Sequence, residues 1–149
     1  MDVLELKGPH GWLRIQCHVV SKEASPIAAK GLQHLHYAVG GQGFSGEADG
    51  FVAEDELRDF CKALVVLADG GHAEANIAGY KEGGLSVRVQ PDSDPGCLSI
   101  EGQIVRQSFR KMSEKDGIYT WATQFGFWVE RDRLSGLRQV RWVLHFISS

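Results

Sequence analysis

The stretch AEDELRDFCKALVVLAD, residues 53–69, decides the fold because its spacing differs from that of the segments around it. Its apolar residues recur every three or four positions, as they do on one face of an amphipathic helix. These residues are Leu57, Phe60, Cys61, Leu64 and Leu67. Three acids open the stretch, where the helix dipole favours negative charge, and Gly70-Gly71 follows as a stop signal. The spacing therefore predicts a helix that buries one face.

The segments on both sides of this helix alternate apolar and polar residues, which is typical of half-buried strands. Turns rich in glycine and proline separate them. We expect strands over 3–7, 12–20, 32–39, 44–52, 74–80, 85–90, 97–109 and 118–129. The turn before the last strand is predicted at Lys115-Asp116-Gly117. This strand is the most aromatic, so we expect it to lie in the centre of the sheet.

The C-terminal segment Asp132–Phe146 returns to helical spacing through Leu134, Leu137 and Leu144, which predicts a second helix. The order is thus four strands, a helix, four strands and a helix. The connections are too short for parallel crossovers, which need about a dozen residues or more. We therefore expect an α+β fold: a single domain over residues 1–149, with a curved antiparallel sheet of about eight strands and two helices against it.

The apolar faces of these elements predict the hydrophobic core. It should contain Leu13, Ile15, Tyr37, Leu57, Phe60, Leu64, Val87, Ile100, Trp121 and Phe125. The chain has three cysteines, Cys17, Cys61 and Cys97, and no two of them form a CxxC motif. Cys17 and Cys61 lie on the apolar faces of predicted elements. We interpret Cys17 and Cys61 as core residues rather than nucleophiles, in a reduced compartment.

The N-terminal residues MDVLELKGPHGW contain no basic region followed by an apolar run. No apolar stretch approaches the about 20 residues that a membrane-spanning helix needs. We therefore expect a cytoplasmic protein with no membrane partner.

The known catalytic and cofactor motifs give no positive signal. Gly41-Gln42-Gly43-Phe44-Ser45-Gly46 matches G-x-G-x-x-G, but a strand rather than a helix is predicted to follow it, so we expect a glycine-rich hairpin. The chain has no G-x-S-x-G and no HExxH. We expect no cofactor and no catalytic residues.

His34-Leu35-His36 places two imidazoles on one face of a strand, as metal-binding barrels do. The nearest following carboxylate is Glu47, eleven residues further along the chain, which is too far for the usual ligand spacing. We therefore expect no metal site. In the alternative that the chain does bind a metal, His34 and His36 would be its ligands.

Acidic residues gather at the start of the predicted helix, although the formal net charge of the chain is only −3. One interpretation is a solvated face with dipole complementarity, and the other is a surface that receives a basic partner. The partner-binding candidates are Glu47, Asp49, Glu54, Asp55 and Asp59. An opposite basic pole lies at Arg106, Arg110, Lys111, Lys115, Arg131, Arg133, Arg138 and Arg141. No aromatic-stacking or helix-turn-helix signature accompanies this pole, so we do not expect nucleic acid as the partner.

The order of segments over roughly residues 12–145 resembles the WapI-type immunity proteins, small cytosolic partners in bacterial contact-dependent toxin systems. The resemblance rests on Phe44-Ser45-Gly46, on Phe51-Val52 before the acidic helix, and on the GCLSIEG stretch over 96–102. It implies a noncatalytic protein that binds and blocks a cognate toxin domain, and it identifies no contact residues. The alternatives are a small-molecule- or metal-binding β-scaffold that uses the concave face of the sheet, and an interaction module of unknown partner.

Overall fold

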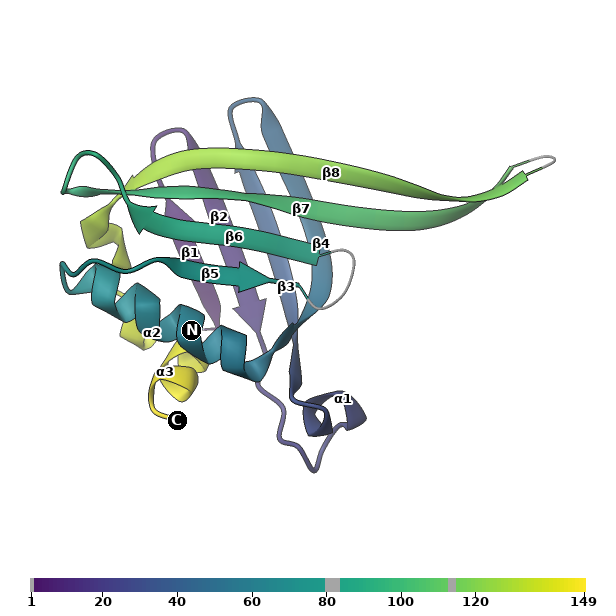
Figure 1. The fold of residues 1–149 in the computed structure, drawn as a ribbon, viewed down its shortest axis with the longest axis horizontal. Coiled ribbons are helices and arrows are strands. Elements are labelled where there is room, and N and C mark those ends of the chain that lie inside the picture. Colours follow the sequence, from purple (N-terminus) through teal and green to yellow (C-terminus); the bar gives the residue numbers. More distant parts are fainter. Residues whose placement is uncertain (1, 80–83, 113–114) are drawn as a thin grey trace.

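A computed structural model describes residues 2–79, 84–112 and 115–149, and for residues 106–112 and 115–121 it describes only the backbone (Figure 1). The elements are β1 (Val3–Lys7), β2 (Gly11–Cys17), α1 (Pro26–Ala29), β3 (Leu32–Gly41), β4 (Phe44–Ala53), α2 (Glu54–Ala68), β5 (Ala75–Ala78), β6 (Gly84–Pro91), β7 (Cys97–Met112), β8 (Lys115–Glu130), the 3-10 turns η1 (Arg131–Leu134) and η2 (Leu137–Gln139), and α3 (Arg141–Ile147). None of the helices in the described ranges is long and apolar enough to cross a membrane.

The strands form two four-stranded antiparallel sheets, each with its strands in sequence order. Sheet A contains β1-β2-β3-β4, and sheet B contains β5-β6-β7-β8. Figure 1 shows the strands of sheet A behind those of sheet B and running across them. The predicted α+β class with eight antiparallel strands is confirmed, but the strands divide between two sheets. The alternation of apolar and polar residues shows that each strand buries one face. It does not show whether the strands before α2 pair with those after it.

The predicted helix is confirmed as α2, which carries the chain from sheet A to sheet B and lies beside β5. Its apolar face is buried against the interior, with Leu57, Phe60 and Leu64 at most 1% exposed. A carbonyl of the last turn of this helix and one just beyond its end accept hydrogen bonds from a residue far along the chain. Nη1 of Arg131 donates hydrogen bonds to the carbonyl oxygens of Leu67 at 2.9 Å and Gly71 at 3.0 Å. One residue of the predicted basic pole therefore stabilises a helix end.

The core fills the space between the inner faces of the two sheets and α2. Nine of the ten predicted core residues are buried, and the side chain of Trp121 lies outside the described residues. Gln33 is also buried, at 2% exposure, on the same face of β3 as Leu35 and Tyr37. Its partners matter for the candidate site, because one of them is a predicted partner-binding acid.

The C-terminal segment differs from the prediction of one helix over 132–146. Two 3-10 turns come first, and only Arg141–Ile147 is α-helical. Leu134, Leu137 and Val140 are buried at intervals of three, which is the repeat of a 3-10 turn rather than an α-helix. Leu144, which the helical spacing placed on the apolar face, is 48% exposed.

Four smaller predictions also differ from the structure. The most aromatic strand, β8, lies at the edge of sheet B and not in its centre. Lys115–Gly117 belong to β8 instead of forming a turn. The segment predicted as a loop contains α1, where the Ser25 hydroxyl accepts a hydrogen bond from the backbone N–H of Ile27. The strand predicted over 74–80 is shorter, at Ala75–Ala78, and Tyr80 lies outside the described residues.

Candidate functional site

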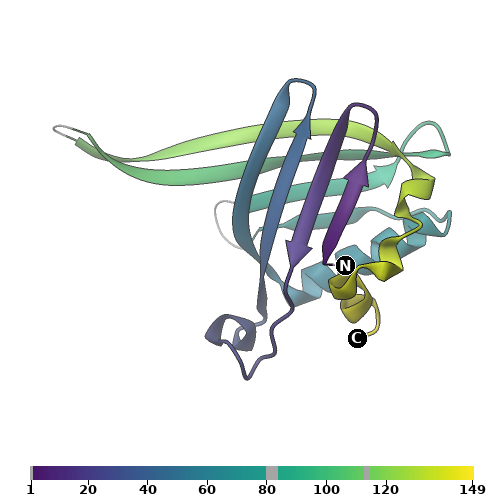
Figure 2. The ribbon, with the colours of Figure 1, turned by 180° about the vertical axis from the view of Figure 1, so that it is seen from behind.

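The outer face of sheet A is open to solvent over all four of its strands. In Figure 2, where this sheet is in front, no other described element passes over its strands. The alternation of each strand turns the apolar residues inward and leaves the other set outward. The outward side chains include Glu5, Lys7, Trp12, Arg14, Gln16, His34, His36, Glu47, Asp49 and Phe51. This set, which we call the sheet A outer face, mixes aromatic and charged residues.

On the β3–β4 half of this face, two histidines lie directly against two carboxylates. Nε2 of His36 is 2.9 Å from Oε1 of Glu47, and its Nδ1 is 3.0 Å from Oδ1 of Asp49. Nε2 of His34 is 3.3 Å from the same Asp49 oxygen. We call these four residues the His–carboxylate cluster. The hairpin brings Glu47 beside the histidine pair although eleven residues separate it from His36 in the chain.

The ring of His36 contacts a carboxylate through each of its nitrogens. A neutral imidazole has one N–H and can donate to only one of the two oxygens. The contact between Nδ1 and Asp49 has the geometry of a hydrogen bond, and the contact between Nε2 and Glu47 lies at ion-pair distance. The two carboxylates make the cluster net negative when both histidines are neutral.

Aromatic contacts continue the face beyond the cluster. The ring of Phe51 lies 5.4 Å from that of His34, centroid to centroid, and Phe51 is 38% exposed. On the neighbouring β2, the guanidinium of Arg14 lies 4.5 Å above the ring of Trp12, in the geometry of a cation–π contact. Arg14 Nε also donates to Oε2 of Glu5 at 2.6 Å. These contacts hold the long side chains of the β1–β2 half in place.

Gly40 allows the Trp12 ring to lie across β3. A Cβ at this position would be 2.5 Å from Cζ2 of Trp12, which is closer than real Cβ contacts come. A larger residue would push the ring, and the Arg14 side chain that rests on it, away from the sheet. The glycine-rich stretch at 41–46 that follows forms the β3–β4 hairpin, as predicted, with Gly43 at φ 81°.

The other three predicted partner-binding acids lie elsewhere, so the structure does not bring all five together. The carboxylate of Glu54 is used in a contact within the fold: its Oε1 accepts a hydrogen bond from Nε2 of the buried Gln33 at 2.8 Å. Asp55 and Asp59 are exposed on α2, and Asp55 pairs with Nη1 of Arg58 at 2.8 Å. Only Glu47 and Asp49 belong to the sheet A outer face.

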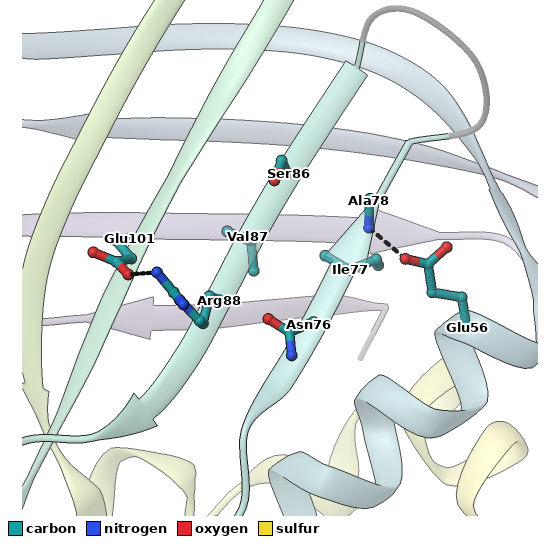
Figure 3. Close-up of a pocket in the computed structure, with 8 residues that line it drawn as sticks. All are labelled: Glu56, Asn76, Ile77, Ala78, Ser86, Val87, Arg88 and Glu101. Atoms are coloured by element: carbon teal, nitrogen blue, oxygen red, sulfur yellow. Dashed lines mark hydrogen bonds and ion pairs between the residues drawn. The ribbon is translucent and has the colours of Figure 1, made fainter.

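A hollow of about 310 Å³ lies on the outer face of sheet B, beside the first turn of α2 (Figure 3). Its polar groups are largely paired with one another. The guanidinium of Arg88 contacts Glu101 and lies 3.9 Å from Glu74, and Oε1 of Glu56 accepts a hydrogen bond from the backbone N–H of Ala78 at 2.8 Å. The charge of Arg88 is thus balanced by Glu101, and Asn76 and Ser86 add polar groups to the lining.

Two of the three cysteine thiols are unfavourably placed for nucleophilic chemistry. Burial raises the pKa of the Cys17 and Cys61 thiols to about 12, and for Cys61 a smaller contribution comes from Cys17. A thiol is nucleophilic as the thiolate, so both are inert at neutral pH. Over the described ranges, no group of three or more His, Cys, Asp or Glu residues is arranged so that it could hold a metal ion, and this includes the His–carboxylate cluster.

Comparisons of the chain with protein-family models, with curated proteins and with solved structures gave no match. The resemblance to the WapI-type immunity proteins therefore stays a prediction. The geometry of the sheet A outer face carries the functional inference.

Proposed function

We propose that this chain is a noncatalytic binding protein of the immunity type, which docks onto a bacterial toxin domain and neutralises it. The observation that supports the proposal is the sheet A outer face, an uncovered surface with aromatic and charged side chains. Protein interfaces are enriched in tryptophan, other aromatics and arginine, and their strongest contacts come from such residues. Trp12, Arg14 and Phe51 supply these types on one face.

Preorganisation also favours a binding role. Ordering a long side chain on binding costs about 0.5–1.5 kcal/mol, and contacts that exist before binding reduce this cost. Arg14 is held by Trp12 and Glu5, and His36 is held between two carboxylates. The face can therefore meet a partner with little rearrangement.

A cell-protection assay tests the proposal. We expect the gene of this chain to lie beside a gene for a toxin domain. That domain is expressed with the wild-type chain, and we expect growth to be restored. Trp12→Ala with Phe51→Ala should lose protection. Val66→Ala with Leu144→Ala removes two other exposed apolar side chains, which are 43% and 48% exposed on α2 and α3, and should protect fully. Growth arrest in the presence of folded wild-type chain would contradict the proposal.

The noncatalytic part has its own test. If the chain blocks the toxin by binding, the activity of the purified toxin domain should fall linearly as chain is added and reach its minimum at equal concentrations. If the chain acted as an enzyme on the toxin, a small fraction of an equivalent would remove all activity over time. Full inhibition by a catalytic amount of chain would therefore overturn the noncatalytic assignment.

A further inference from the structure

The two halves of the sheet A outer face differ in charge. β3 and β4 contain no lysine or arginine, and their only acids are Glu47 and Asp49. Both carboxylates point outward, with side chains 67% and 58% exposed. On the other half, Arg14 is neutralised by Glu5, which leaves Lys7. The β3–β4 half is thus a negative area within a face of otherwise nearly balanced charge.

Each acid of the His–carboxylate cluster keeps one oxygen for another ligand. All of the ion-pair contacts of Asp49 involve Oδ1, and that of Glu47 involves Oε1. Asp49 Oδ2 and Glu47 Oε2 are not the oxygens that make these contacts with the histidines. The two residues alternate on one strand, so their Cα atoms lie about 6.6 Å apart. One ammonium or guanidinium group placed between them can reach both free oxygens.

An apolar surface lies next to this pair of acids. Phe51 follows Asp49 on the same face of β4, and its ring packs on His34. The stem of a long basic side chain can lie along these rings while its charged end reaches the carboxylates. This arrangement favours a lysine or arginine side chain over a small inorganic cation, which would gain nothing from the rings.

We infer that the β3–β4 half of the sheet A outer face is the docking surface for the basic surface of a protein partner, and that a lysine or arginine of the partner lies between Glu47 and Asp49. This inference rests on the proposed function and specifies where and what the chain binds. β3 and β4 have ten residues each and span about 33 Å, whereas β1 and β2 are shorter, with five and seven residues. The about 800 Å² that each partner buries in a standard interface would therefore extend beyond the β3–β4 half, which we take as the centre of the contact.

A second copy of the chain is a weaker match to this surface. In a two-fold dimer the acids of one copy would have to meet a basic area on the same face of the other. Arg14 is already paired with Glu5, and Lys7 alone remains on the β1–β2 half. The charge therefore favours a different protein with a denser basic surface.

Calorimetric titration with the toxin domain encoded beside this gene tests the inference. Glu47→Gln with Asp49→Asn removes both charges and keeps the shape, and we expect the Kd to rise about tenfold or more. Asp55→Asn with Asp59→Asn removes the same charge from α2, and the Kd should change by less than about twofold. Circular dichroism checks that both variants are folded, which we expect because all four side chains are exposed.

The outcomes separate the inference from the proposed function. If the wild-type chain binds and the Glu47 and Asp49 variant binds equally well, the docking surface is elsewhere and the binding function stands. If the wild-type chain does not bind the toxin domain, the proposed function fails and the inference fails with it. If the chain alone sediments as a dimer that the Glu47 and Asp49 variant dissociates, the face belongs to a second copy and the inference is wrong.

Discussion

Nε2 of Gln33 donates a hydrogen bond to Oε1 of Glu54, 2.8 Å away, at the junction where β4 passes into α2. The same amide binds the backbone of Val20 twice, since Nε2 donates to its carbonyl at 3.0 Å and Oε1 accepts from its N–H at 3.1 Å. The buried Gln33 side chain, on β3, thus joins the segment between β2 and α1 to the start of α2. Glu54 is held inside this junction and is not a free surface charge.

Replacement of Gln33 by leucine should destabilise the fold. The change leaves the N–H and carbonyl of Val20 without their partner in a partly buried place, at a cost of about 1–3 kcal/mol. Urea unfolding measures the loss of free energy of unfolding. Gln124→Leu, at an exposed position of β8, is the control and should change it by less than about 0.5 kcal/mol. Equal stability of the two variants would show that the junction contributes nothing.

Tyr37 carries a buried hydroxyl that finds no hydrogen-bond partner among the described residues. The hydroxyl lies in a narrow space, 3.0 Å from where a Cβ of Gly50 would be and 2.8 Å from one of Gly84. Tyr37→Phe removes the unpaired group and keeps the ring, so we expect the free energy of unfolding to rise by about 1 kcal/mol and Tm by about 2–4 °C. A clear loss of stability would mean that the hydroxyl is hydrogen-bonded after all. Tyr37→Ala should lose about 3–5 kcal/mol, because the ring fills the core.

The buried thiols make stability depend on alkaline pH. Burial raises the pKa of Cys17 and Cys61 from 9.0 to about 12. Below pH 9 the thiols are protonated in both states, and their contribution is fully present. Above pH 9 the unfolded chain loses these protons while the folded chain keeps them, so the free energy of unfolding falls as pH rises towards 12.

We expect this loss to reach about 1 kcal/mol for each thiol by pH 10. Urea unfolding at pH 8, 9 and 10 measures it, and Cys61→Ala should show a smaller fall over the same range. If Cys61→Ala keeps the full wild-type dependence, Cys61 is not the group that titrates.

Two alanine substitutions in α2 test which face of this helix is buried. Leu64 is fully buried and Val66 is 43% exposed. Leu64→Ala should cost about 2–5 kcal/mol, the range for buried leucines, whereas Val66→Ala should cost less than about 0.5 kcal/mol. Thermal unfolding compares the Tm of the two variants, and we expect a much lower Tm for Leu64→Ala. Similar Tm values would show that the buried face of α2 is assigned wrongly.

Local spacing predicts most of this fold, because each element is built from a repeat that its own residues display. The strands and α2 were predictable from repeats of two and of three to four residues. The division into two sheets was not predictable from these repeats. Whether β5 continues the sheet of β4 or begins a second sheet depends on how α2, which connects them, packs. The C-terminal segment shows a related limit: Leu134, Leu137 and Val140 fit a repeat of three as well as one of 3.6, and only tertiary packing selects the 3-10 turns.

The His–carboxylate cluster could have been found from the sequence. Glu47 lies eleven positions after His36 in the sequence, but the two residues are close neighbours across the β3–β4 hairpin. With the turn at Gln42-Gly43, His36 lies opposite Asp49 and Ala38 opposite Glu47. Cross-strand neighbours on one face are in contact range, so the register of the predicted hairpin already implied the cluster. The hydrogen bond between Gln33 and Glu54 could not be inferred in this way, because Glu54 lies past the end of β4, in the first turn of α2.

The association rate of the chain with its neighbouring toxin domain tests the central claim most directly. Stopped-flow mixing at about 20 mM and about 150 mM NaCl compares the wild-type chain with Glu47→Lys plus Asp49→Lys, and with Asp55→Lys plus Asp59→Lys as the matched control on α2. If the β3–β4 half of the sheet A outer face attracts a basic partner, the first variant associates much more slowly than wild type at low salt and loses the salt dependence, while the control keeps both. Association of the first variant at the wild-type rate at low salt would contradict the account.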